Sequence, residues 1–82
     1  MARIIDGKET NIVGKQVRRF RLERKMSQKT LSEKLETLAV YICRGSIARI
    51  ESGKRTVTDI ELYGLSRILN KPIESFFDGE NK

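Results

Sequence analysis

The chain has 82 residues, which suits one small domain of about five short helices and leaves no room for a second, catalytic or effector-binding domain. Its net charge of +6 is uneven: residues 1–55 carry 14 Lys and Arg against 6 Asp and Glu, whereas residues 56–82 carry 3 against 5. This asymmetry points to a polyanionic partner or, alternatively, to a surface charge that serves only solubility. The single cysteine, Cys43, excludes an internal disulfide and a Cys-based metal site, and the absence of His excludes His metal ligation and His acid–base catalysis.

Residues 1–10 are predicted to form an N-terminal arm. Arg3 and Lys8 flank the apolar pair Ile4 and Ile5. The segment is either a flexible arm or a short extended piece that packs its isoleucines on the domain, and a basic arm of this kind could follow a DNA backbone.

The first helix is predicted over about residues 11–25. Thr10 or Asn11 can cap its start, because both side chains accept hydrogen bonds from free backbone N–H groups. A buried stripe recurs at helical spacing in Val13, Val17 and Phe20. Arg21 lies at the edge of this stripe, so it needs a carboxylate partner or a route to water.

The second helix is predicted from Gln28, with Ser27 as its cap. Leu31, Leu35 and Leu38 form its buried stripe. The free N–H groups and the dipole at such a helix start can hold a phosphate. An apolar link, more strand-like or turn-like than helical, follows in Val40, Tyr41 and Ile42.

The third helix, over about residues 44–52, has opposed apolar and basic faces. Ile47 and Ile50 share one stripe, while Arg49 points nearly the opposite way. Gly53 ends the helix, since glycine adopts a positive φ at no steric cost, and two basic residues follow it. A helix of this kind suits insertion into a groove walled by phosphates, but any amphipathic surface helix has the same pattern.

Two further helices are predicted beyond this point. Thr58 and Glu61 form a capping box that opens a helix over about residues 59–69, and Asn70 can take the left-handed position at its end. Pro72 suits the start of a fifth short helix in which one of two aromatics, Phe76 or Phe77, closes the core. Residues 78–82 are predicted to be a polar tail.

These signals, taken together, resemble the Cro/C1-type (XRE-like) helix-turn-helix family. The resemblance is carried by Val13–Arg21, Met26–Gln28 with Leu31 and Leu35, Ser46–Arg55, and Leu69–Asn70. Its most specific parts are the pattern Ser-Gln-x-x-Leu, followed later by Ile-x-x-Ile-Glu-x-Gly-Lys-Arg. It covers residues 11–77 and implies an all-α, five-helix, lambda-repressor-like helix-turn-helix domain.

The resemblance also implies roles for individual residues. The positions that match the family's base-contacting sites are Arg44, Gly45, Ser46 and Arg49. The positions expected to contact phosphate are Ser27, Gln28, Lys29, Lys54 and Arg55. Arg21 and Glu51 match positions that often form an internal ion pair, which would supply the partner that Arg21 needs.

The sequence departs from the family between Leu35 and Ile47, where the connection is several residues longer than usual. We expect one extra turn on the second helix, using Leu38 and Ala39, followed by a longer link. This departure makes Arg44 a weaker candidate than Arg49. Cys43 stands where a Ser or Thr cap is usual and should cap poorly.

The function implied is a sequence-specific, double-stranded DNA-binding transcriptional regulator, more specifically a repressor. It would bind a pseudo-palindromic operator as a homodimer, with a dimer surface at Phe76–Phe77 or at Ile4 and Ile5. The alternative is an antitoxin or other protein-interaction module that keeps the fold. No enzyme is expected, because the serines have no histidine to activate them. No cofactor, metal or membrane is expected either, and the chain should be cytoplasmic.

Overall fold

The structure, a computed structural model, describes residues 9–81, with side chains as far as residue 78. Five helical elements follow one another there: α1 (Gly14–Glu23), α2 (Gln28–Glu36), α3 (Arg44–Glu51), α4 (Asp59–Leu69) and the 3-10 helix η1 (Ile73–Asn81). These residues contain no strand. The predicted all-α, five-helix fold is confirmed. Most of the predicted arm, residues 1–8, lies outside the described residues.

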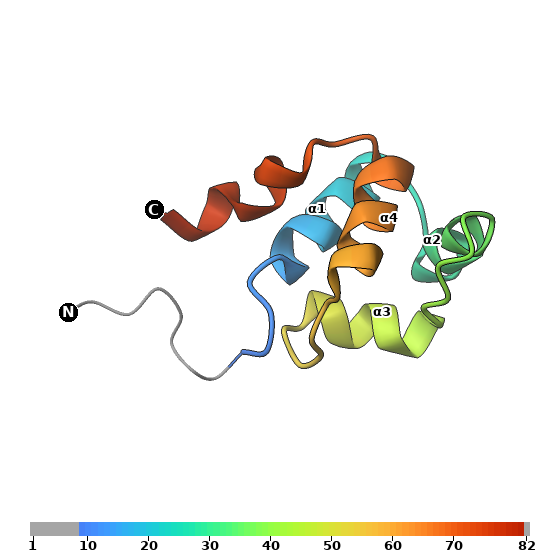
Figure 1. Ribbon diagram of the computed structural model, residues 1–82, viewed down its shortest axis with the longest axis horizontal. Helices are drawn as coiled ribbons and strands as arrows, with labels where there is room; N and C mark the ends of the chain where they lie inside the picture. Colours follow the sequence, from blue (N-terminus) through green and yellow to red (C-terminus); the bar gives the residue numbers. More distant parts are fainter. Residues whose placement is uncertain (1–8, 82) are drawn as a thin grey trace.

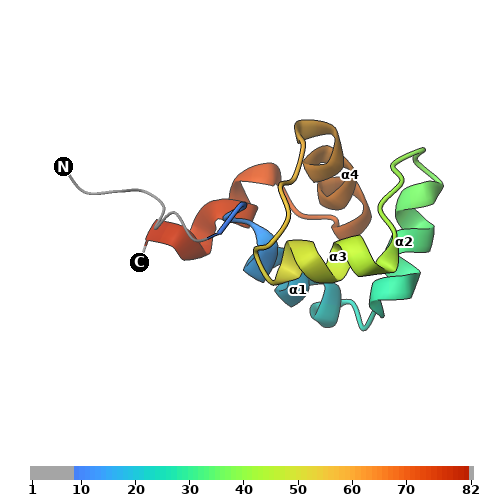
Figure 2. The same ribbon diagram turned by 90° about the horizontal axis from the view of Figure 1, so that it is seen from below.

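The helix α3 lies along one side of the domain. In Figure 1 it runs along the lower side, α4 rises from it at a steep angle, and α2 lies beside its first turn. In the view from below, α3 lies in front of the other helices (Figure 2). One long face of α3 is therefore open to solvent.

The core lies where all five elements meet. Its apolar side chains are at most 8% exposed, and they are Val13, Val17, Phe20, Leu31, Leu35, Val40, Ile42, Ile47, Ile50, Leu65, Leu69 and Phe76. Each helix contributes one stripe, as expected for amphipathic helices around a single small core. α3 is fixed in this core through Ile47 and Ile50, each 1% exposed.

η1 closes the core with Phe76, the outcome expected for one of the two aromatics. The rings of Phe76 and Phe20 meet edge to face, with their centroids 5.1 Å apart. Because Phe76 is fully buried, it is not available for the dimer surface expected there, and Phe77 also packs partly against the core. The polar tail predicted from residue 78 is helical as far as Asn81.

The start of α1 differs from the prediction. The helix begins at Gly14, and its N-cap residue, Val13, makes no side-chain cap hydrogen bond. Asn11 nevertheless serves this helix end, because its Oδ1 accepts hydrogen bonds from the N–H groups of Val13 (3.1 Å) and Gly14 (2.7 Å). The helix ends at Glu23, before Lys25 adopts a φ of 56°.

The extra turn predicted on α2 is wrong. The helix ends at Glu36, and Ala39 adopts a left-handed φ of 61°. The N–H of Val40 then bonds back to the Leu35 carbonyl at 3.1 Å, which is the Schellman way of closing a helix. Leu38, predicted to be in the buried stripe, is 42% exposed.

Packing against α4 explains why α2 stops there. Val40 and Leu35 press against Gly64, where a Cβ atom would lie 3.0 Å from Val40 Cγ2 and 3.3 Å from Leu35 Cδ2. The left-handed residue turns the chain so that Val40 and Ile42 are buried instead of continuing a helix into solvent.

The remaining helix boundaries agree with the predictions. Ser27 caps α2, and Thr58 and Glu61 form both halves of a capping box at the start of α4. Asn70 ends α4 in the left-handed conformation, with φ 56° and ψ 49°.

Candidate nucleic-acid interface

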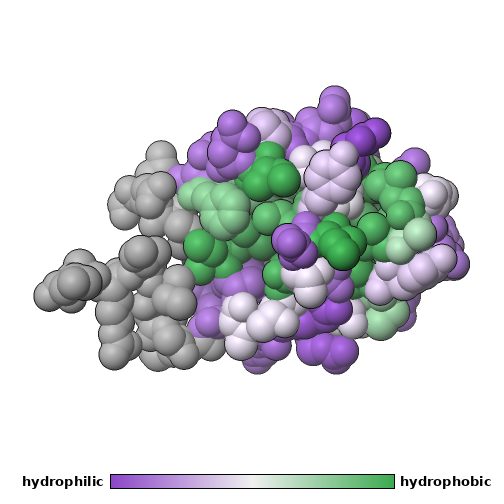
Figure 3. All heavy atoms as spheres, viewed as in Figure 1, coloured by the Kyte–Doolittle hydropathy of each residue, from purple (hydrophilic) through white to green (hydrophobic). Residues whose placement is uncertain are grey.

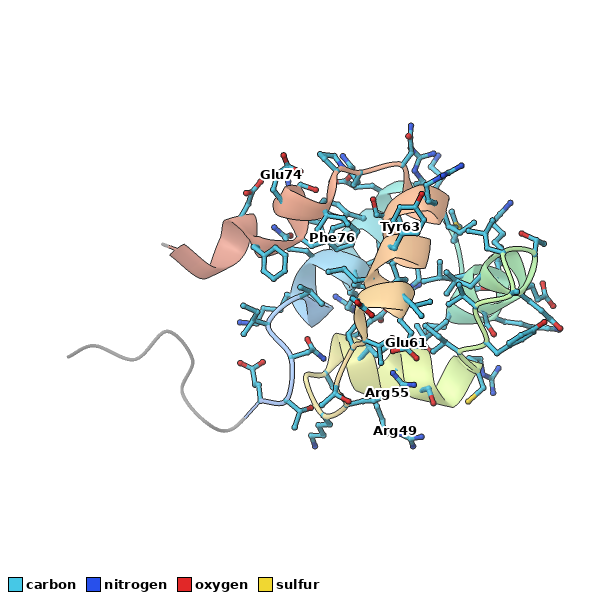
Figure 4. All side chains as sticks on the ribbon, in the orientation of Figure 1. Arg49, Arg55, Glu61, Tyr63, Glu74 and Phe76 are labelled. Carbon is cyan, nitrogen blue, oxygen red and sulfur yellow. The ribbon has the colours of Figure 1, made fainter. Side chains whose placement is uncertain are left out.

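The open face of α3 carries the side chains expected to contact bases. Arg44, Gly45 and Arg49 are exposed, and Ser46 is half-buried. Arg49 points away from the domain below α3 (Figure 4). Gly45 has no neighbouring atom within 4 Å of where a Cβ would stand, so this part of the face is flat and open. The structure thus brings all four candidates onto or beside one accessible surface.

The first turn of α3 is held weakly by its own cap. Cys43 is the N-cap residue, but its side chain caps no backbone N–H group. Its exposed thiol lies 3.4 Å from Ser46 Oγ, and the Ser46 hydroxyl is the main cause that lowers the pKa of the thiol. Tyr41, which precedes this turn, is 73% exposed.

The start of α2 lies close to α3. Ser27 Oγ accepts a hydrogen bond from the Thr30 N–H at 3.0 Å, so the hydroxyl is engaged in capping. Gln28 Nε2 donates to Glu51 Oε1 at 3.0 Å, which ties the start of α2 to the end of α3. Lys29 is exposed. Of the three phosphate candidates here, Lys29 is free to reach outward, and Gln28 is positioned as a brace.

Arg21 and Glu51 form a buried ion pair beneath α3. Arg21 Nε and Nη2 donate to the two carboxylate oxygens of Glu51 at 2.7 and 3.0 Å. The remaining donor, Nη1, bonds the Met26 carbonyl at 2.8 Å. The side chains are 9% and 4% exposed. The pair therefore joins α1, the α1–α2 turn and α3 and is not a surface for DNA.

In the turn after α3, Lys54 is exposed to solvent, whereas Arg55 is paired with a carboxylate of α4. Gly53, with a φ of 78°, turns the chain, and Lys54 is exposed beyond it. Arg55 instead points toward α4, where Nη1 and Nη2 donate to Glu61 Oε1 and Oε2, both at 3.0 Å (Figure 4). The predicted contact of Arg55 with phosphate stays a prediction, and the structure shows that the Nη1 and Nη2 groups of its guanidinium are engaged by Glu61.

In this second ion pair, Arg55 and Glu61 each stabilise the charged form of the other. The hydrogen bonds from Arg55 hold the pKa of the Glu61 carboxyl below its ordinary value, assisted by the N–H of Thr58. Glu61 in turn raises the pKa of Arg55. Sequence reasoning identified Glu61 only as a capping residue. Its pairing with Arg55 joins a turn to a helix, so no helical spacing could have indicated it.

The described residues contain no cluster of His, Cys, Asp and Glu that could hold a metal ion. None of their helices is both long and apolar enough to cross a membrane.

Comparison with protein families gives one match. A family model described as helix-turn-helix matches residues 17–76, which run from the middle of α1 to Phe76 in η1. The match includes α2, α3 and the turn that carries Lys54. No curated protein matches the chain.

Proposed function

Because the chain belongs to the Cro/C1-type helix-turn-helix family of DNA-binding regulators, we propose that it is a sequence-specific transcriptional regulator that reads double-stranded DNA with α3. The observation that carries this proposal is the exposure of Arg49 on a helix whose opposite face is anchored by Ile47 and Ile50. A rigidly backed helix with an outward arginine can enter a major groove without losing its own packing.

Affinity and specificity would come from different side chains. Lys29 and Lys54 would neutralise phosphates and release counterions, which gives binding strength but no sequence information. Arg49, and with it Arg44, would each take guanine O6 and N7 in a bidentate contact, worth about 1–3 kcal/mol of discrimination per base. Gly45 would allow the backbone of α3 to approach the bases closely.

A single domain of this size reads too few base pairs to select one site in a genome. We therefore propose a homodimer on a pseudo-palindromic operator, with half-sites about one helical turn apart. We further propose that it acts as a repressor, because a dimer seated on its operator would occlude that stretch of DNA.

A protein-interaction module, such as an antitoxin, is the second candidate, and an apolar patch on α4 favours it. Ile60 and Tyr63 are 69% and 54% exposed, and Leu38 lies nearby. With Val40, Gly64 and Arg67 they line a cavity of about 240 Å³. Figure 3 shows hydrophobic side chains on this face of the domain.

A binding titration with duplex DNA at several salt concentrations separates the two candidates. DNA binding predicts a linear fall of log K with log salt, with a slope of about −0.9 for each phosphate neutralised. A role in which the chain binds only another protein predicts a flat response of log K to salt.

Arg49→Glu tests the site itself. This variant should lose DNA binding while it folds normally, because Arg49 is exposed and its charge would now repel phosphate. Arg67→Glu is the matched control, since it makes the same charge change on the exposed face of α4 near its C-terminal end. Equal losses in the two variants would mean that only net charge matters, and the proposed site would be wrong.

A further inference from the structure

The segment before α1 is bonded to the turn that carries Lys54. The N–H of Thr10 donates to the Gly53 carbonyl at 2.8 Å, and Thr10 Oγ1 donates to the same oxygen at 3.1 Å. These residues are 43 positions apart in the chain. Figure 1 shows the two stretches side by side, one leading into α1 and the other leaving α3.

Asn11 uses its whole side-chain amide at this junction. Its Nδ2 donates to the Ile50 carbonyl at 3.0 Å and to the Arg55 carbonyl at 2.7 Å. Its Oδ1 accepts from the N–H groups of Val13 and Gly14. An asparagine amide has two donors and two acceptor lone pairs, and all four are satisfied here. No other neutral side chain offers this pattern at this length, so the residue type is strongly specified.

These bonds fix the backbone on both sides of Lys54. The carbonyl of the preceding residue, Gly53, is bonded to Thr10, and the carbonyl of the following residue, Arg55, is bonded to Asn11. The N–H of Lys54 itself bonds the Arg49 carbonyl at 2.8 Å. The turn is therefore held in one conformation relative to α3, although Lys54 itself is exposed.

We propose that Asn11 is a positioning residue for DNA binding, which holds the turn after α3 so that Lys54 meets a phosphate while α3 lies in the groove. This inference rests on the proposed function. Without the bonds from Asn11, the turn keeps its bonds to Thr10 and Arg49 but is less restrained around Arg55, and the phosphate contact must then overcome a larger ordering entropy. Asn11 thus acts on phosphate affinity through Lys54, and not on base discrimination by Arg49.

Asn11→Asp separates the contact of Asn11 with the turn from its capping of the α1 N-terminus. The carboxylate still accepts from Val13 and Gly14, where a negative charge also suits the helix N-terminus. It cannot donate to the carbonyls of Ile50 and Arg55, so the part of the restraint that Asn11 supplies is lost. Thr56→Asp is the matched control, because it adds the same charge to the same turn at an exposed residue and leaves the Asn11 bonds in place.

The test is a double-mutant cycle with Lys54→Ala, read as the salt slope for binding of the full chain to a short duplex of mixed sequence. In the natural background, Lys54→Ala should reduce the magnitude of the slope by about 1. With Asn11→Asp present, Lys54→Ala should cause a clearly smaller reduction than in the natural background. With Thr56→Asp present, the full reduction should remain.

Additive losses in the Asn11→Asp background would overturn the inference, as would a Lys54→Ala variant that keeps the natural slope. Either result leaves the proposed function standing if the natural protein binds the duplex with a steep slope. Absence of salt-dependent binding by the natural protein would instead defeat the proposed function. Should Asn11→Asp fail to fold, Asn11→Ser gives the same comparison, since a serine can cap α1 but cannot donate twice.

Discussion

Arg21 is a charged residue buried beneath α3, with a side chain only 9% exposed. Its three hydrogen bonds, two to Glu51 and one to the Met26 carbonyl, satisfy the guanidinium inside the domain. A buried pair of this kind is costly to break on one side, because the remaining charge is left without a partner.

Glu51→Ala should therefore lower the free energy of unfolding by about 3–5 kcal/mol. Replacing both partners, with Arg21→Met and Glu51→Leu together, should recover much of this loss because no unpaired charge remains. Urea unfolding followed by circular dichroism measures the free energy of unfolding of the single and the double variant. A double variant as unstable as Glu51→Ala alone would show that the pair matters for reasons other than charge burial.

Glu61 makes the stability of the turn after α3 depend on pH. Its pKa is lowered in the folded state, chiefly by Arg55, so the stabilisation is present above the ordinary carboxyl pKa and is lost as the pH falls through the folded-state pKa. Glu61→Gln keeps the capping acceptor but removes the charge.

Near neutral pH, Glu61→Gln should be less stable than the natural protein, and the difference should disappear in acid. Thermal melts between neutral pH and the acid side of the carboxyl titration measure this difference. Thr58→Ala is the control, since loss of its hydroxyl cap should cost about 1 kcal/mol with little dependence on pH. A constant difference for Glu61→Gln across the range would show that the ion pair contributes nothing.

At the scale of the elements, the connection between α2 and α3 is the part that sequence reasoning placed wrongly. Most helix ends carry their own signals within a few residues, such as Ser27 before α2, the capping box before α4 and Asn70 after it. Those ends could be predicted. The end of α2 depends on Val40 packing against Gly64, a contact between distant parts of the chain that no local pattern reveals.

Ala39 provides a direct test of this connection. A left-handed alanine is strained because its Cβ crowds the following carbonyl, whereas glycine adopts the same conformation freely. Ala39→Gly should therefore raise the free energy of unfolding by about 1 kcal/mol despite the greater flexibility of the unfolded chain. Denaturant unfolding of the natural protein and of Ala39→Gly measures this difference in the free energy of unfolding. Destabilisation of that size would mean that α2 continues through Ala39, as the sequence alone suggested.

The sequence likewise predicted part of the candidate site and missed part of it. The third helix and its outward Arg49 follow from periodicity, because two isoleucines on one stripe define the opposite face. The roles of Arg55 and Asn11 do not follow, since their partners, Glu61 and the Ile50 carbonyl, are brought to them only by the packing of α1, α3 and α4. Sequence showed which residues are basic, and the structure shows which of these remain exposed.

At the scale of the whole molecule, the open face of α3 belongs to the part of the chain that is rich in Lys and Arg. α3 and the turn after it belong to residues 1–55, which hold most of the positive charge, while α4 and η1 lie in the acidic remainder. Sequence position alone does not fix the direction of the field, so the proposed DNA-facing surface rests on the exposure of Arg49 on α3.

Selection of bound duplexes from a random DNA pool, run in parallel for the natural protein and Arg49→Ala, tests the central claim most directly. The natural protein should select a site with two related half-sites, each containing a guanine that the variant no longer prefers, with the other preferred bases unchanged. Identical preferences for the two proteins would contradict the claim that α3 reads the major groove through Arg49.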